Sequence, residues 1–246
     1  MSDIFDALES QQDRLDRILQ GLDEDQWNAP SACPGWTVRD VVLHLAQTEE
    51  GVAATLEGSL PPFPVTEGAT TIDEVVENWV SSQRGAASGE VHDRWNAARR
   101  KALEGLKSAD PEQPVAWAAA PLKPRTLATT RLSEHWIHTL DITDPLGIDD
   151  PDGDDLKNIA WLAFKTLGYA YSREGRGEPP TVRLELDAPD GEKWVFGAED
   201  AEVVIAGPAG EFCRIAARRL SPDKAEKLTA TGDRAGEVLE LVRTYA

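Results

Sequence analysis

The stretch RLSEHWIHTLDITDPLG, residues 131–147, constrains the fold of this chain more than any other segment. If it is a helix, residues three, four and seven positions apart share one face. A polar stripe then consists of Glu134, His138 and Asp141. An apolar stripe on another flank consists of Leu132, Trp136 and Leu140. A helix with both stripes is expected to pack against neighbouring elements rather than to be solvated.

A carboxylate and an imidazole one turn apart on a packed helix are typical of a divalent metal site. One helix supplies two ligands in this way, and zinc needs at least one more ligand from elsewhere. The chain has only four histidines, which are His44, His92, His135 and His138. Asp141, on the same stripe, is either a fourth ligand or the acceptor that orients an imidazole. The spacing therefore predicts a metal site with a short list of candidate ligands.

The spacing also leaves other interpretations open. Glu134 and His138, four residues apart, form a polar pair that stabilises a helix without any metal. His135 and His138, three residues apart, form a competing pair of ligands that spacing does not exclude. His44 lies at the edge of the apolar stripe of an earlier segment, where a histidine is commonly a partly buried side chain. His92 has charged neighbours, which predicts a surface position.

Apolar periodicity predicts that the first part of the chain is helical. Thr37 and Thr71 are each followed three residues later by an acidic residue, as in a capping box. Residues 23–36 contain prolines and a glycine and are predicted to form a loop. The predicted helices cover residues 3–22, 38–56, the segment from Ile72 through Trp79, roughly 90–107, 131–147, and Pro151 to about Tyr171.

The period changes after the linker-like segment GRGEPP, residues 175–180. Alternating apolar residues predict three strands, around Val182–Leu186, Trp194–Phe196 and Val203–Ile205. Two further helices are predicted at Pro208–Arg219 and Arg234–Tyr245. The fold class is therefore α+β. A bundle of four to five helices over residues 1–174 is followed by a small α+β domain over residues 175–246.

Composition excludes several kinds of partner. The formal net charge is −19, which opposes binding to nucleic acid or to an anionic membrane, because phosphates attract a surplus of Lys and Arg. No apolar run is long enough to span a bilayer, and the acidic start MSDIFDALES does not look like a secretory signal. Cys33 and Cys213 are far apart in sequence and do not suggest a disulfide framework. A cytoplasmic protein is expected.

One segment adds a resemblance to these patterns. WNAPSACPGWTVRDVVLHL, residues 27–45, is similar to the N-terminal signature of the mycothiol-dependent maleylpyruvate isomerase family, within the DinB-like metal-binding superfamily. The features that carry the resemblance are CPGW at 33–36, TVRD at 37–40 leading to His44, and the pattern Glu134-x-x-x-His138-x-x-Asp141. In the C-terminal part they are GPA at 207–209, RRL at 218–220 and TGD at 231–233. The chain most resembles a subfamily labelled metal-binding or wyosine base formation, which has no assigned reaction.

The resemblance implies a DinB-like up-down helical bundle with a divalent metal, usually zinc, on His44, Glu134 and His138. Two His and one Glu leave a coordination position open, as in catalytic zinc sites. Family members use this position to turn a low-molecular-weight thiol such as mycothiol into a nucleophile. The resemblance also implies an arginine that holds an acidic substrate, which is Arg219 here, with Arg218 as an equally placed rival.

The sequence therefore predicts a metal-binding enzyme of isomerase or S-transferase type, which uses zinc or another divalent ion, a small thiol and a small electrophilic substrate. Two alternatives stay open at this point. One is a metal-binding or sensing module without turnover, and the other is a metal hydrolase that uses bound water. Cys33, in a Pro-Gly turn before a helix, is expected to have a structural role rather than to act as a nucleophile.

Overall fold

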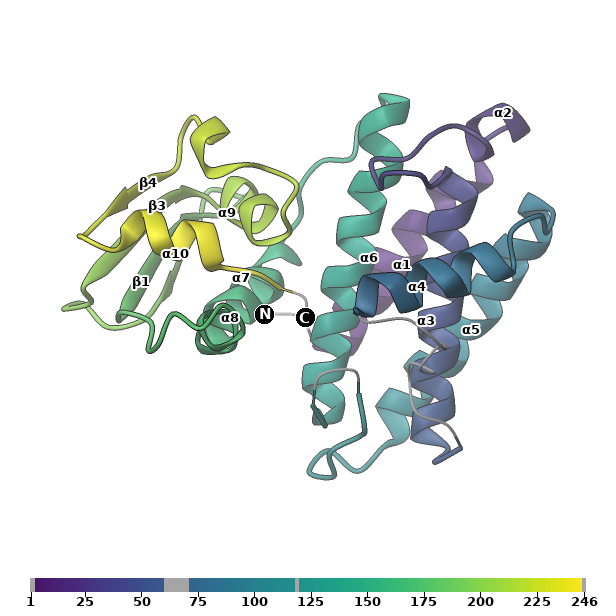
Figure 1. Cartoon of the computed structure of the whole chain (residues 1–246), viewed down its shortest axis with the longest axis horizontal. Helices are drawn as coiled ribbons and strands as arrows, with labels where there is room; N and C mark the ends of the chain where they lie inside the picture. Colours follow the sequence, from purple (N-terminus) through teal and green to yellow (C-terminus); the bar gives the residue numbers. More distant parts are fainter. Residues whose placement is uncertain (1–2, 60–70, 118–119, 245–246) are drawn as a thin grey trace. The chain divides into compact units, whose positions relative to one another are not determined.

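The computed structural model describes residues 3–59, 71–117 and 120–244 of the chain (Figure 1). The chain forms two compact units, Met1–Asp150 and Pro151–Ala246. The first unit is helical, whereas the second combines helices with a four-stranded sheet, so the predicted α+β fold is confirmed. No helix in the described part of the chain is long and apolar enough to cross a membrane.

Four long helices form the frame of the first unit. Its helices within the described ranges are α1 (Ile4–Gln20), α2 (Glu24–Trp27), α3 (Val38–Leu56), α4 (Ile72–Ser82), α5 (Ser88–Ser108) and α6 (Pro124–Leu146). α3 packs along α5, α1 packs along α6, and α5 also contacts both α1 and α6. Apolar side chains of these helices share one core, which is the helical bundle that the sequence predicts.

Helix α3 begins where the sequence predicts. The Thr37 hydroxyl accepts a hydrogen bond from the Asp40 amide, and the Asp40 carboxylate accepts one from the Thr37 amide, so the predicted capping box is present. Val41 and Val42 are fully buried on the inner face of the helix. His44 follows them and is only 5% exposed. The cap thus sets the register that brings His44 into the bundle.

Helix α6 is buried on most of its circumference, so its polar side chains must find partners inside the protein. It starts at Pro124, earlier than predicted, and ends at Leu146, where Gly147 caps the helix with a positive φ of 64° in the left-handed region. Leu132, Trp136 and Leu140 are all buried, as the apolar stripe predicts.

Two predicted segments contain one helix more than the sequence predicts. The predicted loop at residues 23–36 contains the short helix α2, because Asp23 and Gln26 form a capping box of their own. The single helix predicted from Pro151 to Tyr171 is instead two helices, α7 (Leu156–Lys165) and α8 (Leu167–Arg173). The break falls at Thr166, whose hydroxyl donates a hydrogen bond to the carbonyl of Arg243.

The second unit is organised around a sheet with the strand order β2-β1-β3-β4. Its further elements are β1 (Val182–Asp187), β2 (Lys193–Phe196), β3 (Val203–Pro208), α9 (Ala209–Ala216), the 3-10 turn η1 (Pro222–Lys224), β4 (Thr229–Thr231) and α10 (Ala235–Leu241). β1 and β3 are parallel, and the outer pairs are antiparallel. The three predicted strands are confirmed. β4 was not predicted, since it is only three residues long and lacks an apolar alternation.

The two C-terminal helices end earlier in the sequence than predicted. α9 ends at Ala216 rather than near Arg219, and α10 ends at Leu241. Tyr245, the predicted end of the last helix, lies outside the described residues. The sequence predicts two domains, 1–174 and 175–246, and this division stays a prediction. The compact units divide after Asp150, since α7 packs against α9 and β2.

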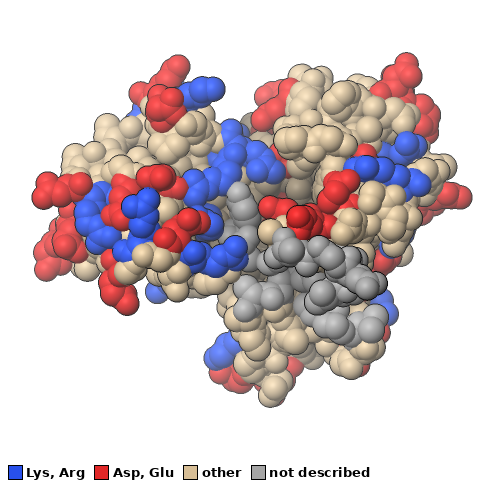
Figure 2. All heavy atoms as spheres, in the orientation of Figure 1, with Lys and Arg blue, Asp and Glu red and all other residues tan. Residues whose placement is uncertain are grey.

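The acidic surplus is spread over the surface. Figure 2 shows Asp and Glu side chains scattered over the visible face of each unit, rather than gathered in one patch. Many of them pair with basic side chains, as Glu50 does with Arg94 and Glu174 does with Arg243. Exposed pairs of this kind contribute little to stability, and their main effect is on solubility and on the choice of partners.

The capping box of α3 gives a first test. Replacing Thr37 by Ala removes the hydroxyl that accepts from the Asp40 amide, and we expect the free energy of unfolding to fall by about 1 kcal/mol. Thr37→Ser keeps an acceptor oxygen and should lose clearly less. Urea unfolding followed by circular dichroism measures both. Equal losses in the two variants would contradict the capping role.

Candidate metal centre

Three side chains from two helices converge inside the first unit. Oε1 of Glu134 on α6 lies 3.1 Å from Nε2 of His44 on α3 and 3.4 Å from Nε2 of His138 on α6. The donor atoms of the three residues all lie within 4.8 Å of one another. The two imidazole rings meet edge to face, with their centroids 5.0 Å apart. The structure thus brings together the three residues that the resemblance implied as ligands.

The donor set fits a divalent transition metal. Zinc binds imidazole nitrogen and carboxylate oxygen at about 2.0–2.2 Å, so tetrahedral donors lie roughly 3.3 Å apart. The two nitrogen–oxygen separations are close to that value. The side chains of His44 and His138 are 7% and 10% exposed, whereas that of Glu134 is 24% exposed. The three side chains are therefore mostly buried, and Glu134 is the most exposed of them.

Asp141 lies on the far side of the His138 ring. Its Oδ2 atom is 2.9 Å from Nδ1 of His138, and its side chain is fully buried. Because Nδ1 is engaged there, Nε2 is the nitrogen that faces Glu134 and His44. This arrangement resembles the carboxylate–histidine–metal pairs that fix the tautomer of a ligand. Of the two roles that the sequence left open for Asp141, the geometry supports the acceptor that orients an imidazole.

Burial and mutual contact shift the pKa values of these groups in different directions. Burial lowers the pKa of His44, although the Glu134 carboxylate opposes it. Burial alone would lower the pKa of His138, but hydrogen bonds with Asp141, Cys33 and Glu134 raise that pKa well above its usual range. The pKa of Glu134 is well below normal, because hydrogen bonds from both histidines outweigh the opposite effect of burial. Glu134 is therefore held as a carboxylate.

The other two histidines lie outside this cluster. His135 is fully buried, accepts a hydrogen bond from Nε1 of Trp95 at its Nε2, and holds its Nδ1 2.9 Å from the carbonyl of Arg131. Burial lowers the pKa of His135 to about 3. Both ring nitrogens are thus used in the core, and the competing pair of His135 with His138 does not form a site. His92 is half-buried rather than on the surface, and it contacts Asp16 at 2.6 Å.

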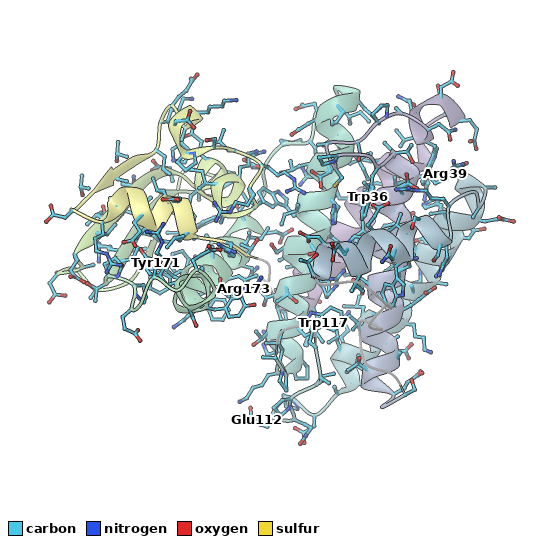
Figure 3. All side chains as sticks on the ribbon, viewed as in Figure 1. Trp36, Arg39, Glu112, Trp117, Tyr171 and Arg173 are labelled. Carbon is cyan, nitrogen blue, oxygen red and sulfur yellow. The ribbon has the colours of Figure 1, made fainter. Side chains whose placement is uncertain are left out.

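An ion pair without access to water lies behind the three candidate ligands. Nε of Arg131 donates to Glu49 at 2.7 Å, and another guanidinium nitrogen of Arg131 donates to the Thr48 hydroxyl at 2.8 Å. The Trp117 ring, labelled in Figure 3, lies 5.7 Å from the guanidinium carbon of Arg131. Burial raises the pKa of Glu49, and the Arg131 charge opposes that shift. Arg131 also adds positive charge that favours the ionised form of Glu134.

Neither this ion pair nor the contact between Cys33 and Asp141 was predicted from the sequence. Arg131 lies three residues before Glu134 and seven before His138, so the same helical spacing could have identified it. Glu49 gave no such signal, because its partner is 82 positions away. The Cys33 thiol donates to Oδ2 of Asp141 at 3.1 Å, a contact that no local pattern encodes. The predicted turn at Cys33 is present, and it also borders the site.

The arginines implied for substrate binding belong to the second unit. Nη1 of Arg219 donates to the carbonyl of Ala217 at 3.1 Å, just beyond the end of α9. Arg218 is exposed and adopts a positive φ of 60°, the only non-glycine residue to do so in the described part of the chain. The role of either arginine stays a prediction, since it depends on a substrate.

A family of known proteins matches the part of the chain that carries these side chains. The model of the mycothiol maleylpyruvate isomerase N-terminal domain family matches residues 8–143, more than half of the chain. The chain belongs to this family. The match covers α3 and most of α6, the two helices that carry the three converging side chains. Assignment to the subfamily labelled metal-binding or wyosine base formation stays a prediction.

Relatives and solved structures cover nearly the whole chain. Two uncharacterized proteins of Mycobacterium tuberculosis, MT0041 from strain CDC 1551 / Oshkosh and Rv0036c from strain ATCC 25618 / H37Rv, are each 29% identical over 242 residues, covering 97% of this chain and 93% of the relative. Crystal structures of the mycothiol-dependent maleylpyruvate isomerase and of a histidine-to-alanine mutant of it match with TM-scores of 0.65 and 0.64, at 18% and 17% identity. Each match covers 93% of this chain and 91% of the other, and at this identity the likeness concerns the fold.

The ion pair behind the site gives a second test. Arg131→Met leaves the Glu49 carboxylate buried without its cation, so we expect a loss of about 3–5 kcal/mol in the free energy of unfolding. The double variant Glu49→Gln/Arg131→Met removes both charges and should recover most of that loss. Urea unfolding of the two variants measures the difference. If the double variant is as unstable as Arg131→Met or less stable, the pair does not act as a compensated buried charge.

Proposed function

We propose that this protein is a metal- and thiol-dependent enzyme of isomerase or S-transferase type. His44, Glu134 and His138 would hold a divalent metal, with zinc as the first candidate. The observation that carries the proposal is the convergence of two imidazoles and a carboxylate, from two helices, at a largely buried site. Two His and one Glu on zinc leave a position for an exogenous ligand, as catalytic rather than structural zinc sites do.

Residues around the site orient the His138 ring and keep Glu134 ionised. Asp141 holds the His138 ring so that Nε2 points to Glu134 and His44. Hydrogen bonds from both histidines and the charge of Arg131 keep Glu134 ionised, which is the form that binds a cation. The metal, when bound, would favour the thiolate form of a thiol at its open position, which makes that thiol a nucleophile near neutral pH.

The family supports the choice of partners. Similarity to an isomerase named for its dependence on mycothiol supports a low-molecular-weight thiol, mycothiol first, as the second reactant. The thiolate would attack a small electrophile, either by adding to an activated double bond or by displacing a leaving group. If the electrophile carries a carboxylate, Arg219 is the proposed group to hold it. The two cysteines, Cys33 and Cys213, are free thiols, which supports the reducing cytoplasm as the compartment.

Metal content is the first measurement for this proposal. We expect about one equivalent of zinc in protein purified without added metal, and loss of that metal in His138→Ala, because two protein ligands remain. His92→Gln is the matched control, since His92 contacts Asp16 outside the site, and it should keep the metal. No metal in the wild type after reconstitution with zinc would contradict the proposal.

Removal of the metal tests the dependence on thiol. A sample stripped with chelator should lose binding of a low-molecular-weight thiol in calorimetry and regain it when zinc is restored, because the thiol would bind as a metal ligand. Thiol binding that survives stripping would contradict the proposed mechanism. Metal binding with no thiol binding at all would instead favour a non-catalytic metal-binding module, and hydrolysis that is independent of thiol would favour a metal hydrolase.

A further inference from the structure

A second group of donor atoms lies on the opposite edge of the His138 ring. Sγ of Cys33 is 3.1 Å from Oδ2 of Asp141 and 3.9 Å from Nδ1 of His138. Oδ2 of Asp141 is 2.9 Å from the same Nδ1. A thiol, a carboxylate and an imidazole nitrogen thus meet at one point, and none of these atoms belongs to the donor set on the Glu134 side.

We propose that Cys33, Asp141 and Nδ1 of His138 form a second metal site, which favours a strongly thiophilic divalent ion such as Cd²⁺. The proposal does not depend on the proposed enzymatic function, since either site can fail while the other stands. A thiolate is a soft ligand, and its presence separates this site from the His–Glu–His set, which also suits harder ions.

The distances at this site are compatible with one bound ion. Zinc takes sulfur at about 2.3 Å and nitrogen or oxygen at about 2.0–2.2 Å, so tetrahedral donors lie roughly 3.3–3.6 Å apart. The observed separations of 2.9, 3.1 and 3.9 Å bracket that range, and a small movement of the Cys33 side chain would equalise them. Cys33 is partly exposed, so an ion can reach the sulfur, whereas Asp141 is fully buried behind it.

The backbone holds the thiol in place before any ion binds. The amide of Ala32 donates to the carbonyl of Asp141 at 2.9 Å, which ties the loop to α6 next to the donor atoms. Within the loop, the Ser31 hydroxyl donates to the carbonyl of Trp36 at 2.9 Å, and the Cys33 amide donates to the Ser31 hydroxyl at 3.2 Å. The turn at Cys33, for which the sequence predicts a structural role, therefore also holds the Cys33 sulfur beside the His138 imidazole and the Asp141 carboxylate.

Use of Nδ1 by an ion has a consequence for the first site. Binding would release the Sγ proton to solvent and would use the lone pair of Nδ1, so the one proton of the neutral ring would lie on Nε2 instead of Nδ1. A neutral imidazole has one nitrogen lone pair to offer, so Nε2 would then be a donor to Glu134 and not a ligand. The two sites share His138 and exclude each other, and a thiophilic ion at Cys33 would disable the His44–Glu134–His138 set.

Cadmium titration of the full chain, stripped of metal, tests this site, with Cd²⁺ alone as the probe. We expect an ultraviolet thiolate-to-cadmium charge-transfer band in the wild type, which reports a Cd–S bond directly. His44→Ala removes a ligand of the first site only and should keep the band. Cys33→Ser should lose the band because the sulfur is gone, and His138→Ala should lose the band as well, because it removes a second ligand of the site.

Each result decides the proposal. Absence of the band in the wild type, its loss in His44→Ala, or its survival in Cys33→Ser would overturn it. Cys213 serves as an internal control because it is fully buried in the second unit and is present in every variant. Zinc content separates the two sites, since Cys33→Ser should still hold zinc on His44, Glu134 and His138. If Cys33→Ser lacks zinc while His44→Ala keeps the cadmium band, the enzymatic proposal fails and the second site stands.

Discussion

The structure of the first unit depends on placing ionisable side chains inside a helical bundle without leaving a charge unpaired. Burying an isolated carboxylate or imidazolium is costly, so such groups persist only when their neighbours compensate them. Glu134 is compensated by two imidazoles, and Glu49 by Arg131. Because all of these groups lie on α3 and α6, the crossing of those two helices is fixed by polar contacts as well as by apolar packing.

This constraint explains how much of the fold could be predicted from sequence. Apolar periodicity and capping residues are local, and they located the long helices and the three longer strands. Features that depend on distant partners were missed. At the break between α7 and α8, the Thr166 hydroxyl contacts the carbonyl of Arg243, which is 77 positions away, and β4 is a strand only through its pairing with β3. The sequence near these positions contains no periodicity that would show them.

In the candidate site, too, local spacing predicted some residues, whereas contacts with distant residues could not be predicted. The spacing of Glu134 and His138 brought both side chains onto one face, but spacing alone did not decide between His135 and His138. Trp95, on another helix, donates a hydrogen bond to Nε2 of His135. That nitrogen is therefore not available as a metal ligand, and His138 is the remaining candidate. The third residue of the cluster, His44, came from the resemblance rather than from periodicity, because the pairing of α3 with α6 cannot be read from either helix alone.

His138 is the residue on which these polar contacts meet. Each of its nitrogens faces a carboxylate, Glu134 at Nε2 and Asp141 at Nδ1. A single imidazole between two carboxylates can present a lone pair to only one side at a time. Asp141 favours the tautomer whose lone pair is on Nε2, toward Glu134. In the proposed second site, Cys33 would add a soft sulfur donor beside Nδ1 for a thiophilic ion. In the two proposed sites, the tautomer of this one ring would therefore determine whether a metal binds at Nε2 or at Nδ1.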